Sequence, residues 1–499
     1  MGFAARKPIA DLVDQGGVTF TPQLGLGSLT LMGIGSTIGA GVFVLTGTAA
    51  AQYAGPAIAI SFVIASVACL GAGLCYAELA AMIPVAGSAY TYAYVALGEG
   101  VAWTIGWSLV LEYLLSASTV AVGWSGYFAA AAGELGVHLP AVIAGPPVTF
   151  FHGAWRATGS WVNLPAVAVI LAVTALLSKG LRRSALANSL VVSLKLLIVL
   201  LVVGFGAAHV NAANWRPFIP ANTGAFGEFG WSGVVRGAGV VFFAYVGFDM
   251  VSSSAQEALR PRRDIPMSLM LSLLVCTGLY IAMSLVMTGL VPFKTLNVPH
   301  PVFVAIAGGG PRLTWLKPGI SLGVIVGLCS TILVCLYGQT RLFYAMGRDG
   351  LIPAIFAKLD PSSHTPVFGT WLLGACAATV AGLVPIDILG EMVSIGTLLA
   401  FVIVAVGVLA LRLRHPQWHR PFRVPWVWFT GPAAIAICLY MMISLPIATW
   451  IRLLVWLAIG AVIYVFYGRH KSRLAKRNNG TEQPASTPRR SSPFKAGRR

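Results

Sequence analysis

One lysine stands in a long apolar segment of the chain. Lys195 lies within LVVSLKLLIVLLVVGFG (190–206), where no other residue is charged. A lysine in the middle of a membrane-spanning helix costs about 3 kcal/mol on insertion scales. Loss of water disfavours the charged form of a buried ammonium, which lets such a lysine exchange a proton near physiological pH. Lys195 is therefore a candidate for moving a proton.

Two other interpretations of Lys195 remain open from the residues alone. The lysine could extend its ammonium to the membrane surface, which lies about ten residues, or about 15 Å, from it along a helix. It could instead be a structural charge held by a fixed acidic residue. Its depth and its partners decide between these alternatives.

Two segments carry helix-breaking glycines inside apolar sequence. GIGSTIGAGVF (33–43) has glycines at 33, 35, 39 and 41, and VVFFAYVGFDMVSSS (240–254) contains Gly247 and Asp249. Glycine costs about 1 kcal/mol in a helix interior, and unwound backbone within a membrane is tolerated where it lines a cavity. Glycines also allow close helix packing, which is the alternative for the first segment. Interruptions in both halves of a chain favour a binding site between inverted repeats.

The ends of such broken helices have opposite chemistry. A half-helix that starts near Gly41 presents free N–H groups and a positive dipole end, which suit a carboxylate. A half-helix that ends near Phe243 and Ala244 presents free carbonyls, which suit an ammonium group. A ligand with both groups on one carbon fits between them, so the residues predict an α-amino acid.

The elements that position these residues are membrane-spanning helices. The chain has 499 residues, of which 57% are hydrophobic and only 10% are charged, against about 25% charged in soluble proteins. Apolar runs near the length that crosses a bilayer predict an all-α integral membrane protein with 12 transmembrane helices in a single domain. The runs cover residues 26–50, 56–82, 101–132, 164–178, 186–208, 232–256, 268–292, 319–346, 366–384, 390–412, 427–446 and 449–467.

The net charge of +18 reflects membrane topology rather than nucleic-acid binding. Arginine and lysine concentrate in the loops after the fourth, sixth, eighth and tenth runs and after the last one. By the positive-inside rule, both termini are predicted to be cytoplasmic. Residues 1–23 form the predicted N-terminal segment, 24–468 the helical domain, and 469–499 a basic, disordered tail.

Several motifs resemble the amino acid–polyamine–organocation superfamily, and most of all the bacterial members of its cationic amino acid transporter family. The resemblance runs from about residue 22 to 468. It implies a five-plus-five inverted repeat with discontinuous helices 1 and 6, with repeats at about 26–208 and 232–412 and two further helices at 427–467. It also implies transport by alternating access. The motifs are GIGSTIGAGVFVLTG (33–47), YAELAAMIPVAGSAYTYAYVALGE (76–99), EYLLSASTVAVGWSGYF (112–128), FFAYVGFDMVSSSAQE (242–257), YGQTRLFYAMGRDGLIP (337–353) and RPFRVP (420–425).

Position by position, the resemblance implies roles for backbone and side chains. Phe243 would be the gate above the substrate, although an ordinary packed aromatic residue is the alternative. The ammonium of Lys195 would replace a sodium ion, near the hydroxyls of Ser330 and Thr331. The substrate carboxylate would bind the backbone of Thr37, Ile38, Gly39, Ala40 and Gly41, and the amino group the carbonyls of Phe243, Ala244 and Val246.

Two residues bear on the substrate side chain. By the resemblance, Glu112 borders the side-chain pocket, where it could contact a cationic substrate or pair with a protein donor. Leu328 occupies the opposite wall, where a small residue would make room for long basic substrates. The leucine favours neutral amino acids, and cationic substrates remain the alternative.

The predicted function is proton-coupled import of L-amino acids across the cell inner membrane. A sodium- and proton-independent facilitator or exchanger of cationic amino acids is the alternative, followed by a receptor that binds without transport. The sequence has no metal-ligand cluster, nucleophile–base pair or nucleotide-binding loop, so no enzyme activity, metal or cofactor is expected. The expected partners are the amino acid, a proton and the lipid bilayer. Nucleic acid is not among them, and an accessory membrane subunit is left open.

Overall fold

The computed structural model describes residues 6–7, 24–83, 88–151, 154–180, 185–253, 257–361 and 365–474. Most of the predicted N-terminal segment and the predicted tail beyond residue 474 lie outside this part. The main helices are α2 (Leu26–Thr37), α3 (Thr46–Ala49), α4 (Ile58–Met82), α5 (Ser88–Ala96), α6 (Glu99–Glu134), α7 (Leu164–Ser178), α8 (Ala185–Ala207), α9 (Gly230–Val241), α10 (Met250–Ser253), α11 (Pro261–Leu290), α12 (Pro301–Gly308), α13 (Leu316–Arg348), α14 (Val367–Leu383), α15 (Ile386–Arg414), α16 (Val427–Ser444), α17 (Ile447–Ile463) and α18 (Arg469–Lys471).

Helices occupy each apolar run that the sequence identifies as a span. Within the described residues, nine helical stretches are long and apolar enough to cross a membrane. The sequence predicts twelve, and the difference has two sources. α7 and α14 are apolar but shorter, and the stretch Gly41–Met82 joins the end of the first run to the second.

The prediction of an all-helical chain misses one small element. Strands β1 (Val148–Phe151) and β2 (Ala154–Ala157) pair as an antiparallel hairpin. The hairpin lies between α6 and α7, outside the apolar runs, so it does not alter the predominantly helical character of the chain.

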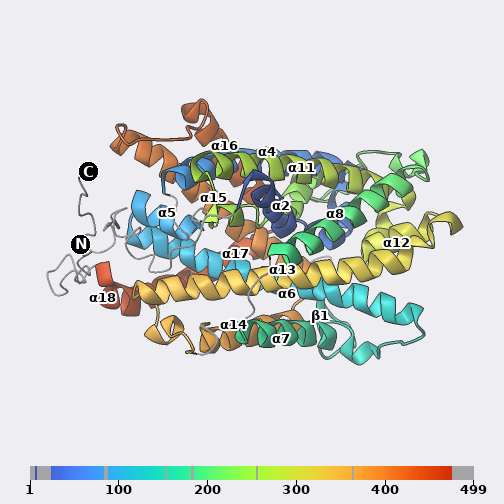
Figure 1. Ribbon diagram of the computed structural model, residues 1–499. Coiled ribbons are helices and arrows are strands. Elements are labelled where there is room, and N and C mark those ends of the chain that lie inside the picture. The colour runs from blue at the N-terminus through green and yellow to red at the C-terminus, as the bar shows by residue number, and fades with distance from the viewer. Residues whose placement is uncertain are drawn as a thin grey trace, which may run out of the picture.

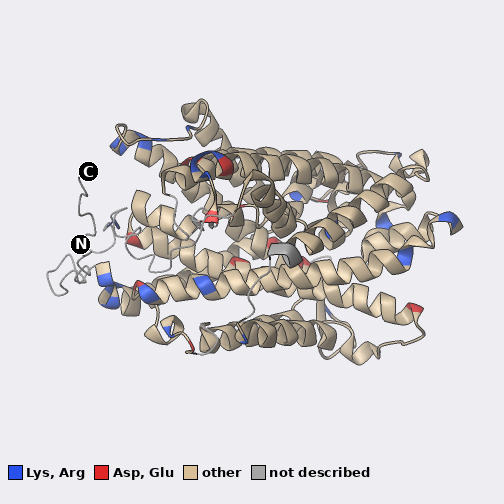
Figure 2. Cartoon of the chain, in the orientation of Figure 1, with Lys and Arg blue, Asp and Glu red and all other residues tan. Residues whose placement is uncertain are grey.

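The helices form an elongated bundle with two distinct ends (Figure 1). α5 and α18 lie at one end, called here the α5 end, and α12 and β1 lie toward the other, called here the α12 end. Charged residues gather toward the two ends, and the ribbon between them is mainly uncharged (Figure 2). This distribution fits a bundle whose middle lies in hydrocarbon.

Long helices make the scaffold of the bundle. α6 packs against both α13 and α15, while α4 packs along α11. α2 lies between α8 and α11, and α7 pairs with α14. α2 therefore contacts the helix that carries Lys195, and α6 and α13 face each other along their length (Figure 1).

α5 is a short helix directly before the long helix α6. Its tyrosines Tyr90, Tyr92 and Tyr94 are buried. Tyr94 donates a hydrogen bond to the carboxylate of Glu99, which also accepts from Ser472. Burial raises the pKa of Tyr94, and the Glu99 charge adds to this rise. The phenol therefore stays a proton donor at physiological pH.

A second buried carboxylate ties the α5 ends of two helices together. Glu78 of α4 accepts two hydrogen bonds from Arg412 of α15, at 2.9 and 2.7 Å. It also pairs with Arg420 at 3.2 Å and accepts the backbone N–H of Val424. Glu78 is 1% exposed, so this carboxylate is satisfied almost entirely by protein groups.

Candidate substrate and ion site

The first interrupted helix breaks where its glycines accumulate. α2 ends at Thr37, Ile38 is extended with ψ 104°, and helical structure resumes at Gly41 as a π-helical turn. Gly41 lies directly against the backbone of Ala244, and a Cβ at this position would collide with it. A glycine is thus required for the two broken helices to meet.

The second interruption follows α9. A 3-10 turn covers Phe242–Tyr245, Val246 is extended, and Gly247 has φ +103°, a conformation that favours glycine. Ser36 of α2 donates a hydrogen bond of 2.9 Å to the carbonyl of Gly247. The two interruptions, more than 200 residues apart in sequence, are therefore in direct contact.

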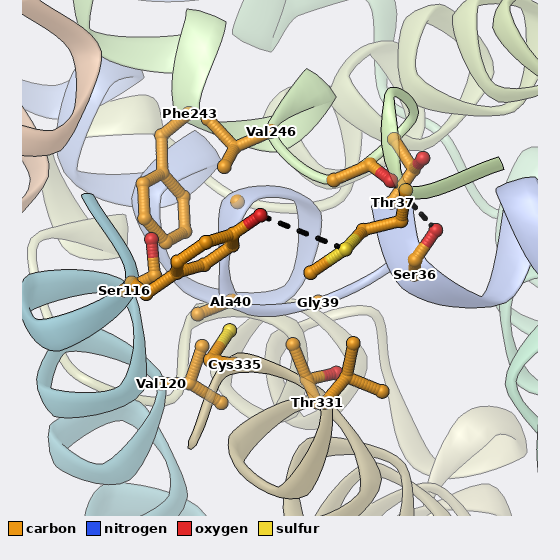
Figure 3. A pocket seen from close by; sticks show the side chains of 15 residues that line it. Ser36, Thr37, Gly39, Ala40, Ser116, Val120, Phe243, Val246, Thr331 and Cys335 are labelled. Atoms are coloured by element: carbon orange, nitrogen blue, oxygen red, sulfur yellow. Dashed lines mark hydrogen bonds between the residues drawn. The ribbon is translucent and has the colours of Figure 1, made fainter. Parts of the chain in front are cut away.

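A cavity lies between the two interruptions (Figure 3). The empty space between its lining atoms, with the open solvent on its unclosed side included, is about 440 Å³. α6 and α13 supply the walls that face the broken helices. The lining residues are Ser36, Thr37, Gly39, Ala40, Gly41, Tyr113, Ser116, Val120, Phe243, Val246, Gly247, Met250, Thr331, Val334 and Cys335.

The backbone groups predicted to bind the substrate differ in how many hydrogen bonds they already make within the protein. A helix start such as the turn at Gly41 leaves its first N–H groups without partners in that turn, but the N–H of Phe43 bonds the Gly39 carbonyl at 3.3 Å. The carbonyl of Phe243 accepts the N–H of Val246 at 3.1 Å, and that of Ala244 accepts the Tyr280 hydroxyl at 3.0 Å. Each carbonyl keeps one further lone pair for a ligand. The amino-group side is therefore more occupied by protein contacts than the sequence suggests.

Lys195 is buried, with 1% of its surface exposed. Its ammonium donates to the carbonyls of Gly35 and Ile38 at 3.0 Å each and to the Thr331 hydroxyl at 2.8 Å. The three donors of the ammonium are thus satisfied. Extension of the lysine to the membrane surface is excluded by this burial. Within the described residues, no carboxylate lies within 4.0 Å of it, so the fixed-acid alternative also finds no support.

Three predicted site residues do not reach these groups. Ser330 donates to the Gly327 carbonyl of its own helix, at 2.8 Å, rather than facing Lys195. Leu328 is fully buried and does not line the cavity. Glu112 is also buried outside the cavity lining, one helical turn from Ser116 toward the α5 end.

Several cavity residues were not identified from the sequence. Tyr113, Ser116 and Val120 project from α6, and Val334 and Cys335 from α13. Their spacing of three to four residues is that of one helix face. This periodicity could have found them once Thr331 and the breaks were placed, but the residue types alone look like ordinary packing.

Arg236 of α9 contacts residues of two other segments. Its guanidinium lies 4.7 Å from the centre of the Tyr53 ring, and one nitrogen is 4.0 Å from a carboxylate oxygen of Glu391. Glu391 in turn accepts a hydrogen bond from Thr449. Arg236 therefore links α9 to α15 inside the bundle.

Comparison with known proteins identifies the family to which this chain belongs. The sequence profile of a family described as "Amino acid permease" matches residues 24–468. The chain belongs to the amino acid permease family. This assignment confirms the resemblance to the amino acid–polyamine–organocation superfamily.

Relatives of the permease are transporters, not enzymes. It is 44% identical to a branched-chain amino acid permease of Bacillus subtilis over 94% of its own length and 98% of that protein. It is 42% identical to a methylthioribose transporter of the same organism, over 94% and 99% of the two chains. It is 40% identical to a vacuolar cationic amino acid transporter of Arabidopsis thaliana, over 78% and 63%. The permease is therefore an amino acid transporter of the membrane.

Proposed function

We propose that the permease is a secondary active importer that moves neutral L-amino acids together with protons by alternating access. The observation that carries this proposal is the contact of Lys195 with the end of α2. An ammonium with no carboxylate partner in the part of the chain that the structure describes occupies the place where α8, α13 and the first interruption meet. A cation that can lose its proton at this point is suited to couple a proton to helix movement.

Protonated Lys195 holds the carbonyls of Gly35 and Ile38 and the hydroxyl of Thr331. A neutral amine can donate only two hydrogen bonds and carries no charge to attract these oxygens. Deprotonation therefore loosens the end of α2 from α13. Because α2 continues into the turn at Gly41, loosening it also changes the substrate site.

The substrate would lie across the two interruptions. Backbone N–H groups over Thr37–Gly41 would bind its carboxylate, and the free lone pairs on the carbonyls of Phe243, Ala244 and Val246 would bind its amino group. The Phe243 ring lines the cavity and would act as the gate over the substrate.

A neutral substrate is supported by the cavity lining. None of its fifteen described residues is Asp, Glu, Lys or Arg, so a charged substrate side chain would lack a counter-ion there. The relative named as a branched-chain amino acid permease agrees with a neutral substrate. The cationic transporters and the methylthioribose transporter among the relatives supply the alternatives that a substrate panel must contain.

The proposed architecture is a twelve-helix transport domain over residues 24–468 with two inverted repeats of five helices and two further helices. The even number of spans places both termini on one side. We assign the α5 end to the cytoplasm of a bacterial cell, because the basic loops after the fourth, sixth, eighth and tenth spans lead to that end. The cell inner membrane is the proposed location.

One experiment separates the proposed function from its alternatives. Purified permease in proteoliposomes would be given a labelled branched-chain amino acid, with and without an imposed pH gradient and without sodium. Competitors would include neutral and cationic amino acids and methylthioribose. We expect accumulation that depends on the gradient and is inhibited by neutral amino acids. Gradient-independent exchange of arginine would support the facilitator, and binding without accumulation would support a receptor.

A further inference from the structure

Tyr113 and Met250, two residues of the cavity lining, contact each other. The Tyr113 hydroxyl lies 3.7 Å from the sulfur of Met250, within hydrogen-bond range for sulfur (dashed in Figure 3). Tyr113 belongs to the scaffold helix α6, whereas Met250 is the first residue of α10, directly after the second interruption. The contact therefore joins a continuous helix to a broken one.

Both residues lie at the α5 end of the cavity lining on their elements. Along α6, which starts at the α5 end, Tyr113 precedes Ser116 and Val120. In the other interrupted segment, which runs toward the α5 end, Met250 is the last lining residue after Phe243. Tyr113 and Met250 thus bound the same side of the cavity.

Gly338 of α13 lies against both Met250 and Tyr113. A Cβ at Gly338 would lie 2.8 Å from the terminal methyl of Met250 and 3.4 Å from the Tyr113 ring. The missing side chain leaves the space that the methionine tip fills. Gly338 is one turn beyond the lining residue Cys335, again toward the α5 end.

Two buried acidic residues lie next to the contact between Tyr113 and Met250. Glu112 and Asp249, the residues directly before Tyr113 and Met250 in the chain, are both buried, and neither lines the cavity. The cavity itself has no charged lining residue among those described. Two buried acids thus neighbour the Tyr113–Met250 contact without lining the uncharged cavity.

We propose that Met250, held by Tyr113, is the lid of the substrate cavity on its α5 side and limits the length of the side chain that the cavity accepts. This inference rests on the proposed function for its substrate. An unbranched, flexible methionine suits a lid, because its tip can swing away without moving the backbone. When the lid opens, the cavity gains a path toward the α5 end. When it closes, a long side chain meets the methionine before it reaches Glu112 and Asp249.

The native thiol of Cys335 reports on the lid, because it lines the cavity on the inner side of it. The test uses a Cys376→Ser background, which removes the exposed cysteine. A charged, membrane-impermeant thiosulfonate is applied to the α5 side of proteoliposomes. We expect Met250→Ala to speed labelling at least tenfold, and Tyr113→Phe to speed it by a smaller factor. Val120→Ala, which enlarges the cavity away from the lid, is expected to leave the rate unchanged.

A Cys335→Ser variant of the same protein must lose the label, which assigns the signal to this thiol. An unchanged labelling rate in both Met250→Ala and Tyr113→Phe would overturn the lid. This readout needs no transport, so it distinguishes failure of the lid from failure of the proposed function. If Met250→Ala lowers expression, Tyr113→Phe alone decides the outcome, since it removes one oxygen atom.

The limit on side-chain length is tested by competition against branched-chain uptake. We expect Met250→Ala to lower the inhibition constants of phenylalanine, lysine and arginine at least fivefold relative to valine. Val120→Ala should shift the inhibition constant of phenylalanine but not those of lysine and arginine. Only Met250→Ala opens a path from the cavity to Glu112 and Asp249. A substrate profile of Met250→Ala identical to that of the unmodified protein would contradict the selectivity role.

Discussion

The ammonium nitrogen of Lys195 lies 3.0 Å from the carbonyl oxygen of Ile38, the residue at which the first interrupted helix leaves helical geometry. Carbonyls at a helix end lack intrahelical donors, and no water reaches them in hydrocarbon. Lys195 supplies the missing donors from a neighbouring helix. The Lys195 side chain thereby supplies hydrogen bonds to the carbonyls exposed at the break. The same side chain carries a positive charge that is lost when it releases a proton.

Removal of the Thr331 hydroxyl should weaken this arrangement without removing the charge. Thr331→Val deletes a hydrogen bond to a charged group, worth about 1.5–3 kcal/mol. We expect about a tenfold fall in the initial rate of uptake driven by a pH gradient in proteoliposomes. Ser330→Ala is the matched control, because Ser330 bonds only a carbonyl of its own helix in the described structure and should change the rate less than twofold. Equal effects of the two variants would contradict the assignment.

A methyl group at Gly41 should disturb the contact between the interruptions. The Ala side chain would collide with the Ala244 backbone, which cannot yield as a flexible side chain can. Overpacking of this kind costs about 1–3 kcal/mol. We expect Gly41→Ala to lower substrate affinity at least tenfold, measured by ligand-induced thermal stabilisation in detergent. Gly27→Ala, at a position with open space around it, should retain normal affinity.

Loss of the Glu78 charge should destabilise the α5 end of the bundle. Breaking a buried ion pair costs about 3–5 kcal/mol, because the remaining charges stay buried without compensation. Glu78→Gln is therefore expected to lower the midpoint of thermal unfolding by several degrees. Glu134→Gln is the control, since Glu134 pairs with Lys317 at 3.6 Å on the surface, where such pairs contribute about 0–1 kcal/mol. Similar shifts in both variants would argue against the buried network.

The proposed orientation is tested with two introduced cysteines. Leu135 is 84% exposed near the α12 end of α6, and Leu413 is 69% exposed near the α5 end of α15. In intact cells with Cys376 removed, an impermeant maleimide should label Leu135→Cys and not Leu413→Cys. Labelling must reach both after the membrane is permeabilised. The reverse pattern in intact cells would invert the assignment of the two ends.

Much of the helical layout and part of the site follow from residue patterns. Apolar runs of bilayer length predict where helices lie, because hydrocarbon leaves the backbone few other solutions. The glycines at 39, 41 and 247 mark the breaks. The side chain of Thr331 lies against Gly39, the backbone of Ala244 lies against Gly41, and Gly247 has a positive φ. The lysine at 195 stands out because a charge is costly in a span.

Other features depend on tertiary contacts that no local pattern encodes. Tyr113 and Met250 are ordinary types for an apolar helix, and their role at the cavity depends on which helices face each other. Arg236 finds Tyr53 and Glu391 on distant segments. Glu112 and Leu328 lie outside the cavity because their helices present the neighbouring turn to it. The number of helices that meet the length of a membrane span is smaller than predicted, partly because α7 and α14 are short.

The most direct test of proton coupling is concentrative uptake by Lys195→Met, which keeps the length of the side chain and removes its charge. Unmodified and variant proteins are reconstituted in proteoliposomes without sodium and given the same imposed pH gradient. We predict that the unmodified permease accumulates a branched-chain amino acid above the external concentration. The variant should only equilibrate it, while counterflow at equal pH shows that it still binds and translocates. Accumulation by Lys195→Met to the level of the unmodified permease would contradict the coupling role of Lys195.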